Sequence, residues 1–138
     1  MKVNKVLTLL LGVLSIGSMA YAAPQGEVLF DQKCAACHSK SFPKDMNTVV
    51  APAVMGVMRH LKMNYPNKAD AVAFIKDYAL NPSRDKAICM DQKIERFGLM
   101  PSQKGNVTEE ELETIASWMF DNFPPKDFRG MGMGNRFK

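Results

Sequence analysis

The sequence predicts an all-α protein, and three observations support this prediction. Two segments, 67–80 and 108–122, carry apolar residues at the three- and four-residue spacing of amphipathic helices. No run alternates between apolar and polar residues as a half-buried strand would, and no internal repeat is present. The 138 residues are 46% hydrophobic and 23% charged, which is ordinary for a globular protein of one domain.

The N-terminal segment has the pattern of a secretory signal peptide. Lys2 and Lys5 precede an uncharged apolar run over 6–16, and the small-residue triplet Ala20-Tyr21-Ala22 follows. The run is shorter than the roughly 20 apolar residues that a membrane span needs. We therefore expect cleavage after Ala22 and export to a bacterial periplasm, with retention as an N-terminal membrane anchor as the alternative.

Removal of this segment changes the charge balance. The full chain has 18 basic and 14 acidic residues, and loss of the two lysines leaves 16 basic residues and a net charge of +2. No face concentrates lysine and arginine as nucleic-acid binding requires, so we expect no nucleic-acid partner. The predicted organisation is a signal peptide over 1–22, one domain over 23–123 and a flexible glycine- and methionine-containing tail over 124–138.

A short first helix is expected before the cysteines, followed by a long loop. Gly26, Phe30 and Cys34 recur every four residues and so share one helical stripe. Between 39 and 66, prolines, Gly56 and scattered methionines leave no sustained period. We interpret 39–66 as a long wrapped loop with short turns.

The two remaining helices have recognisable ends. Asn67 can cap the middle helix over 67–80, and Asn81-Pro82 stops it. Thr108 and Glu111 form a capping box at the start of the last helix, which runs to about Asn122. Its predicted buried stripe is Leu112, Ile115, Ala116, Met119 and Phe123.

The glycine-rich tail offers no periodicity, which favours a flexible segment. Met131 and Met133 raise the question of copper binding in this tail. Two thioethers alone make a poor metal site, so we interpret these residues as incidental.

The segment Cys34-Ala35-Ala36-Cys37-His38 has the spacing C-x-x-C-H. Two thiols at this spacing can form thioethers to the vinyl groups of one haem, while the adjacent imidazole reaches the iron. A thioredoxin-type pair would need a βαβ context, and zinc would need two further ligands where only Cys89 and His60 remain. A structural disulfide is the simplest alternative, but the motif in an exported chain favours one covalently attached haem c.

At these residues the chain resembles class I c-type cytochromes over most of its length after the signal peptide. Gly26 and Phe30 match positions of that family's N-terminal helix, and Ile115 and Trp118 resemble the C-terminal helix positions that pack against them. The resemblance implies a cytochrome c fold, in which these helices cross while a middle helix and long loops wrap one haem. Without a side chain, a glycine at the crossing lets the two backbones approach closely.

The resemblance also implies two residues near the iron. Ala51-Pro52-Ala53 is similar to the family's proline segment, which implies that the Pro52 carbonyl accepts the Nδ1–H of His38 and leaves Nε2 for iron. Phe97-Gly98-Leu99-Met100-Pro101 is similar to the segment that supplies the axial methionine. The implied iron ligands are His38 and Met100, while Met46, Met55, Met58, Met63 and Met90 are interpreted as core or loop packing.

His60 and Cys89 are the other candidate ligands. Arg59 and Lys62 beside His60 suggest a solvated turn, so we expect an exposed histidine. Cys89 is the odd thiol in an oxidising compartment. We favour an inert buried residue over an intermolecular disulfide or an iron ligand.

The expected function is single-electron transfer between periplasmic or membrane-bound redox proteins by a monomer, without enzymatic activity. Two alternatives stay open, a haem-based sensor or peroxidase-like protein with an open or labile sixth position, and a dedicated electron-transfer subunit of an oxidoreductase complex. Partner docking is expected to be transient and steered by lysines around the haem edge, namely Lys33, Lys40, Lys93 and Lys104.

Overall fold

The computed structural model describes residues 23–128, and every regular element in this range is a helix. In chain order these elements are α1 (Gln25–Lys33), the 3₁₀ turn η1 (Met46–Thr48), α2 (Val54–Asn64), α3 (Lys68–Leu80), α4 (Asp91–Phe97) and α5 (Glu109–Asn122). The all-α prediction is confirmed. The predicted signal peptide and residues 129–138 of the predicted tail lie outside the described residues. Within 23–128, no helix has the length and apolar character needed to cross a membrane.

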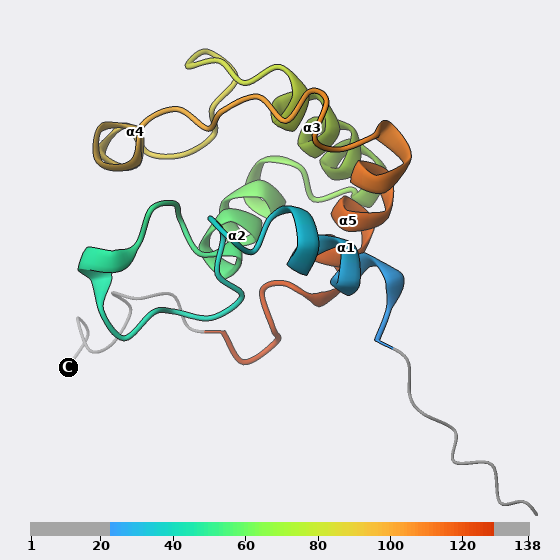
Figure 1. The fold of residues 1–138 in the computed structure, drawn as a ribbon, viewed down its shortest axis with the longest axis horizontal. Helices are drawn as coiled ribbons and strands as arrows, with labels where there is room; N and C mark the ends of the chain where they lie inside the picture. The colour runs from blue at the N-terminus through green and yellow to red at the C-terminus, as the bar shows by residue number, and fades with distance from the viewer. Residues whose placement is uncertain (1–22, 129–138) are drawn as a thin grey trace, which may run out of the picture.

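Helices α1 and α5 cross at a glycine (Figure 1). A Cβ placed on Gly26 would lie 2.3 Å from the Cβ of Trp118 and 2.8 Å from the carbonyl oxygen of Thr114. Both distances are below van der Waals contact, so only glycine fits. Phe30 is 1% exposed, and its ring centroid lies 5.3 Å from that of Trp118.

The main core lies where α2 and α3 pack beside this crossing. Its buried members are Phe30, Val54, Met58, Leu61, Ala71, Ile115 and Met119. A smaller cluster, formed by Ala79, Val107 and Leu112, joins the end of α3 to the start of α5. Most of the stripe predicted for the last helix is therefore buried, and Phe123 at its end is half-buried.

Both predicted helix starts have the expected caps. The Asn67 side chain accepts a 2.8 Å hydrogen bond from the N–H of Ala69 at the start of α3. At the start of α5, the N–H of Glu111 donates to Thr108 Oγ1 at 3.2 Å, and the Thr108 N–H donates to the Glu111 carboxylate at 2.9 Å. These bonds satisfy backbone donors that the first helical turn leaves unpaired.

The prediction of a wrapped loop over 39–66 is wrong for 54–64, which forms α2. Val54, Met58 and Leu61 are spaced by four and three residues, and all three are buried. Gly56 does not interrupt the helix, because it faces open space with nothing within 4 Å of its Cβ position. Tertiary burial of one stripe therefore outweighs the low helix propensity of glycine.

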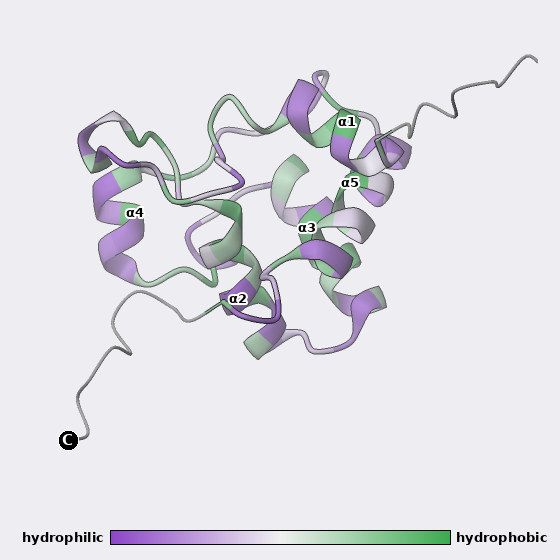
Figure 2. Cartoon of the chain, turned by 90° about the horizontal axis from the view of Figure 1, so that it is seen from below, coloured by the Kyte–Doolittle hydropathy of each residue, from purple (hydrophilic) through white to green (hydrophobic). Residues whose placement is uncertain are grey.

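Helix α4 was not expected from the sequence. It has seven residues, of which only Ile94 is buried, and most of them are hydrophilic (Figure 2). It lies at the opposite end of the molecule from the α1–α5 crossing (Figure 1). The Arg96 guanidinium ties it to η1 through a 2.8 Å hydrogen bond to the Met46 carbonyl.

The first residues of the predicted flexible tail are placed against the body of the protein. The N–H of Phe128 donates to the Pro125 carbonyl at 2.9 Å. The Phe128 ring stacks on Phe42, with centroids 5.8 Å apart. The described chain therefore ends beside the segment that precedes η1.

Candidate cofactor-binding site

The C-x-x-C-H segment forms a compact turn at the end of α1. The N–H groups of Cys34 and Ala35 both donate to the Phe30 carbonyl, at 2.8 and 3.0 Å. The N–H groups of Cys37 and His38 then both donate to the Cys34 carbonyl, at 3.1 and 2.9 Å. This folding brings two thiols and one imidazole together from a short stretch of chain.

Both cysteines of the turn are free thiols. Cys34 packs against the main core, and Cys37 is exposed. Burial, with a smaller contribution from the neighbouring Cys37, raises the pKa of Cys34 to about 11. A thioredoxin-type nucleophile requires a lowered pKa, so this thiol does not fit that alternative.

The structural disulfide and zinc alternatives also lack support. Cys34 and Cys37 are not joined to each other. Within the described part of the chain, no group of three or more His, Cys, Asp or Glu side chains is arranged to hold a metal ion. A structural zinc site ordinarily uses four such ligands.

The imidazole of His38 is fixed by the segment before α2. Its Nδ1 lies 2.8 Å from the Pro52 carbonyl oxygen, the hydrogen bond that the resemblance implies. A carbonyl only accepts hydrogen bonds, so Nδ1 carries the proton and Nε2 keeps its lone pair for a metal. The Val54 N–H donates to the Ser39 carbonyl at 2.9 Å and holds the same two segments together.

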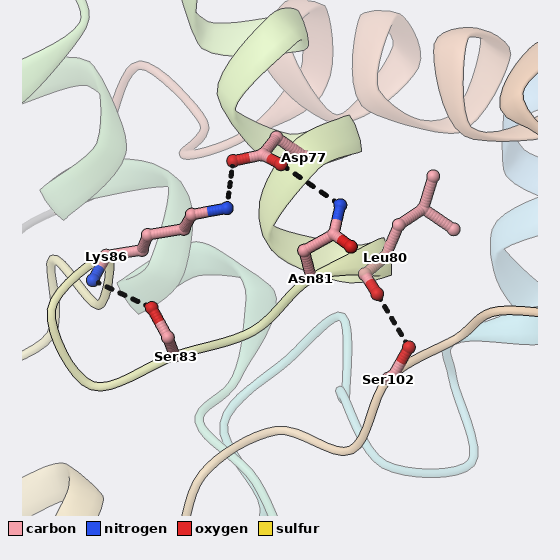
Figure 3. Close-up of polar contacts among 6 residues, drawn as sticks. All are labelled: Asp77, Leu80, Asn81, Ser83, Lys86 and Ser102. Carbon is pink, nitrogen blue, oxygen red and sulfur yellow. Dashed lines mark hydrogen bonds and ion pairs between the residues drawn. The ribbon is translucent and has the colours of Figure 1, made fainter.

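Met100 follows α4 and packs against the smaller cluster at the end of α3. The residues after it are anchored there, because Ser102 Oγ donates to the Leu80 carbonyl at 2.6 Å (Figure 3) and the Gln103 N–H donates to the Ala79 carbonyl at 2.9 Å. Gly98 ends α4 with a φ of 75°, a conformation that favours glycine. Met100 is thus half-buried on a segment that joins α4 to the end of α3.

These residues fit a covalently attached haem. Cys34 and Cys37 could form thioethers, and the Nε2 of His38 and the thioether of Met100 are ligand types that iron accepts in c-type haem proteins. The His38–Pro52 hydrogen bond is the structural observation that distinguishes this site from a pair of incidental thiols.

His60 and Cys89 line one pocket, which Pro52 also lines. His60 is half-buried on α2, so the prediction of an exposed histidine in a turn is wrong. Cys89 is also half-buried, and burial raises its pKa while Lys93 acts in the opposite direction. Both line a pocket of about 90 Å³ between α2, η1 and α4. Sequence reasoning treated the two residues separately, because only the tertiary fold brings them to one place.

The other methionines differ in their surroundings. Met58 is fully buried, as expected of core packing. Met63 is 71% exposed, so its interpretation as a packing residue is wrong, whereas Met90 is 49% exposed and lines the pocket beside Cys89.

Two of the four lysines expected around the haem edge are engaged within the protein. Lys40 lies 2.9 Å from both Glu27 and Asp31, and the two hydrogen bonds raise its pKa. Lys33 donates to the Asn106 carbonyl at 2.9 Å and lies 3.7 Å from Glu111.

Comparisons with known proteins identify relatives of this chain. The model of a family described as cytochrome c oxidase, cbb3-type, subunit III matches residues 22–119. An uncharacterized protein of Aquifex aeolicus (strain VF5) is 30% identical over 112 residues, which cover 72% of this chain and 74% of that protein. No solved structure gives a significant match.

Proposed function

We propose that this chain, which belongs to the c-type cytochrome family described as cytochrome c oxidase, cbb3-type, subunit III, is a carrier of single electrons. In this proposal it is periplasmic and holds one haem. Membership of this family implies a covalently bound haem c and haem-based electron transfer. The single haem, the periplasmic location and the absence of enzymatic activity are part of the proposal. The observation that carries it is the single C-x-x-C-H turn, in which His38 is fixed by the Pro52 carbonyl at 2.8 Å.

Each residue of the site has a distinct role in this proposal. Cys34 and Cys37 would hold the haem covalently, and His38 and Met100 would bind its iron. The bound haem supplies an iron that cycles between Fe(II) and Fe(III). With both of these side chains on the iron, the site would transfer electrons without binding a substrate.

The polypeptide contributes orientation and burial. The hydrogen bond from Nδ1 of His38 to Pro52 fixes the ring and raises the basicity of Nε2. Packing of Cys34 against the main core and of Met100 against the smaller cluster places both sides of the site on apolar surfaces. An apolar, weakly solvated environment is one of the means by which a protein sets the reduction potential.

The axial ligand assignment is tested by comparing two methionines. Met100→Ala should abolish the weak near-infrared sulfur-to-iron band of the oxidised protein and allow carbon monoxide to bind the reduced protein. Met90→Ala is the matched control, since Met90 lies on the other side of α4 in the sequence, and should keep the band.

Survival of the band in Met100→Ala, or its loss in Met90→Ala, would show that Met100 is the wrong ligand. Ready binding of carbon monoxide to the unmutated reduced protein would favour the alternative of a sensor or peroxidase-like protein.

Partner docking is proposed to be transient and electrostatic, and Lys93 and Lys104 are the better candidates for steering it. Lys33 and Lys40 are partly neutralised by their carboxylate neighbours. Lys93→Glu with Lys104→Glu should slow electron transfer to an acidic redox protein at low salt, and Lys33→Glu with Lys40→Glu should have the smaller effect. Stopped-flow rates across a salt series give the measurement, because screening within a Debye length of about 8–10 Å removes steering at high salt. Equal, salt-independent rates in all variants would contradict the steering.

A second candidate function is that of an electron-transfer subunit of an oxidoreductase complex. The observation in its favour is the description of the matching family as an oxidase subunit. Purification from the native membrane fraction under mild detergent separates the two functions. A carrier is recovered free, whereas a subunit is recovered in stoichiometric amount with its complex.

A further inference from the structure

The excess positive charge of this protein lies in residues 129–138. Residues 23–128, the body of the protein, contain 13 basic and 14 acidic side chains, which gives a net charge of −1 with histidine neutral. The ten residues that follow, here called the basic segment, contain three basic side chains and no acidic one, which gives +3. These three are Arg129, Arg136 and Lys138. The body alone therefore has no net charge that would attract an acidic partner.

The last described residue lies beside the proposed haem site. Phe128 stacks on Phe42, with ring centroids 5.8 Å apart and an angle of 22° between the ring planes. Phe42 lines the pocket that Pro52 also lines, and the Pro52 carbonyl oxygen lies 2.8 Å from Nδ1 of His38. The basic segment therefore starts on the side of the body where the haem would be held.

We propose that the basic segment is the docking element of this electron carrier and binds an acidic patch on a redox partner protein. The inference rests on the proposed function, because it requires that the haem exchanges electrons with another protein. The partner that fits carries clustered aspartate and glutamate side chains next to its own redox centre. Charge attraction of this kind speeds the encounter and orients the two proteins.

The acidic side chains of the body are concentrated away from the basic segment. The first five residues of α5 contain four acidic side chains and no basic one. The start of α5 and the last described residues lie on opposite sides of the molecule (Figure 1). An acidic partner is repelled by the first side and attracted to the second, so the charge distribution directs it toward the proposed haem site.

Many basic side chains of the body are already paired with carboxylates. Five lysines have a carboxylate oxygen at 2.6–3.7 Å from Nζ, and such a pair presents little net charge to a partner. Lys93 lines the pocket and can add to the attraction. The five paired side chains are Lys33, Lys40, Lys68, Lys76 and Lys86.

The length and composition of the basic segment favour a protein over a membrane as its partner. Ten residues span at most about 33–36 Å when fully extended, which is several times the Debye length of about 8–10 Å. The cations can therefore meet partner carboxylates before the two proteins touch elsewhere. Anionic lipids are bound by clusters of about 4–8 basic residues, whereas this segment has three, separated by Gly130, Gly132 and Gly134 among other residues.

The experiment measures electron transfer from fully reduced flavodoxin, a small acidic redox protein, to the oxidised holoprotein by stopped flow across a salt series. Arg129→Gln with Arg136→Gln and Lys138→Gln should slow the reaction about tenfold at low salt, the lower end of the range over which steering changes association rates. The rates of this variant and of the unmutated protein should converge at about 1 M salt, where the Debye length is about 3 Å.

The matched control removes three of the lysines that are paired with carboxylates. Lys68→Gln with Lys76→Gln and Lys86→Gln changes the net charge by the same amount and should have a much smaller effect. Phe128→Ala keeps every charge and should slow the reaction less than the loss of the three tail cations, because the basic segment is then no longer held at Phe42. An unchanged haem spectrum and midpoint of thermal unfolding check that each variant is folded.

Reduction by duroquinol, a small uncharged reductant, separates this inference from the proposed function. A haem that accepts electrons from neither duroquinol nor flavodoxin would contradict the proposed function. Normal reduction by duroquinol, together with equal flavodoxin rates in the unmutated protein and the tail variant, would overturn only the docking element. Equal slowing by the tail variant and the lysine control, or no slowing in Phe128→Ala, would overturn it as well. Tail-dependent binding to phosphatidylglycerol vesicles without any change in flavodoxin rates would identify a membrane as the partner instead.

Discussion

The α1–α5 crossing and the segment that carries α4 lie at opposite ends of the molecule and are held in different ways (Figure 1). At the crossing, Gly26 allows backbone contact, and Phe30 and Ile115 are each 1% exposed. Helix α4 has no extensive packing contact with another helix of the described range, and most of its residues are hydrophilic (Figure 2). The first region depends on apolar packing, and the second on a few hydrogen bonds.

In the proposed haem site, this difference separates the two candidate iron ligands. The C-x-x-C-H turn extends directly from α1, so close packing at the crossing supports Cys34 and His38. Met100 belongs to the other region, which is anchored by the hydrogen bonds of Ser102 and Gln103 to the end of α3. We therefore expect the histidine side to be set by the protein fold and the methionine side to open at lower free-energy cost.

The sharpest test of the comparison removes one isoleucine from each region. Ile115→Ala at the crossing should lower the free energy of unfolding by about 2–5 kcal/mol, because the side chain is 1% exposed and leaves a cavity. Ile94→Ala in α4 should have less than half that effect on global unfolding and should mainly speed amide exchange within 91–97. Denaturant unfolding and hydrogen exchange of the holoprotein give both values. Equal losses of global stability would show that the two regions unfold as one unit.

Local sequence signals explain which parts of this comparison could be predicted. The caps at Asn67 and Thr108 and the C-x-x-C-H motif depend on residues close in sequence, so α3, α5 and the cysteine–histidine turn could be predicted, whereas α2 was missed because its burial depends on the tertiary fold. Helix α4 has a single buried residue and therefore no apolar stripe to detect. The grouping of His60 with Cys89 could not be predicted, because it depends on where the fold places the segment before α4 relative to α2.

Two glycines provide the second test, with effects of opposite sign. Gly26→Ala would place a Cβ 2.3 Å from that of Trp118 and should cost about 3 kcal/mol of stability or more, since neither α1 nor α5 can move without loss of packing. Gly56→Ala is the matched control in α2, where nothing lies within 4 Å, and should stabilise the protein by about 0.5–1 kcal/mol through helix propensity.

Thermal unfolding of the Gly26→Ala and Gly56→Ala holoproteins measures the difference between their stabilities. Small losses of similar size in the two variants would show that the crossing can separate to accept a side chain, and would remove the proposed basis for its rigidity.

The smallest expected effect lies in the connection between α3 and α4. Asp77 is exposed, its carboxylate lies 2.6 Å from the Lys86 ammonium, and it accepts a 3.1 Å hydrogen bond from Asn81 (Figure 3). The hydrogen bond from Lys86, followed by that from Asn81, holds the pKa of Asp77 below its usual range. A carboxylate with a lower pKa in the folded state stabilises the protein above its unfolded pKa, and this contribution disappears as the pH falls through the folded pKa.

Because water screens an exposed pair, Asp77→Asn should leave global stability at neutral pH almost unchanged. The variant should instead speed amide exchange over 82–90 at pH 7, and this difference from the unmutated protein should vanish at a pH below the folded pKa of Asp77. High salt should reduce the difference at neutral pH, because screening weakens an exposed ion pair. Asp85→Asn is the control on the same exposed connection and should leave exchange in that segment unchanged at every pH. A large loss of global stability in Asp77→Asn would mean that the α3–α4 connection is as strongly coupled to folding as the α1–α5 crossing, which would contradict the difference between the two regions.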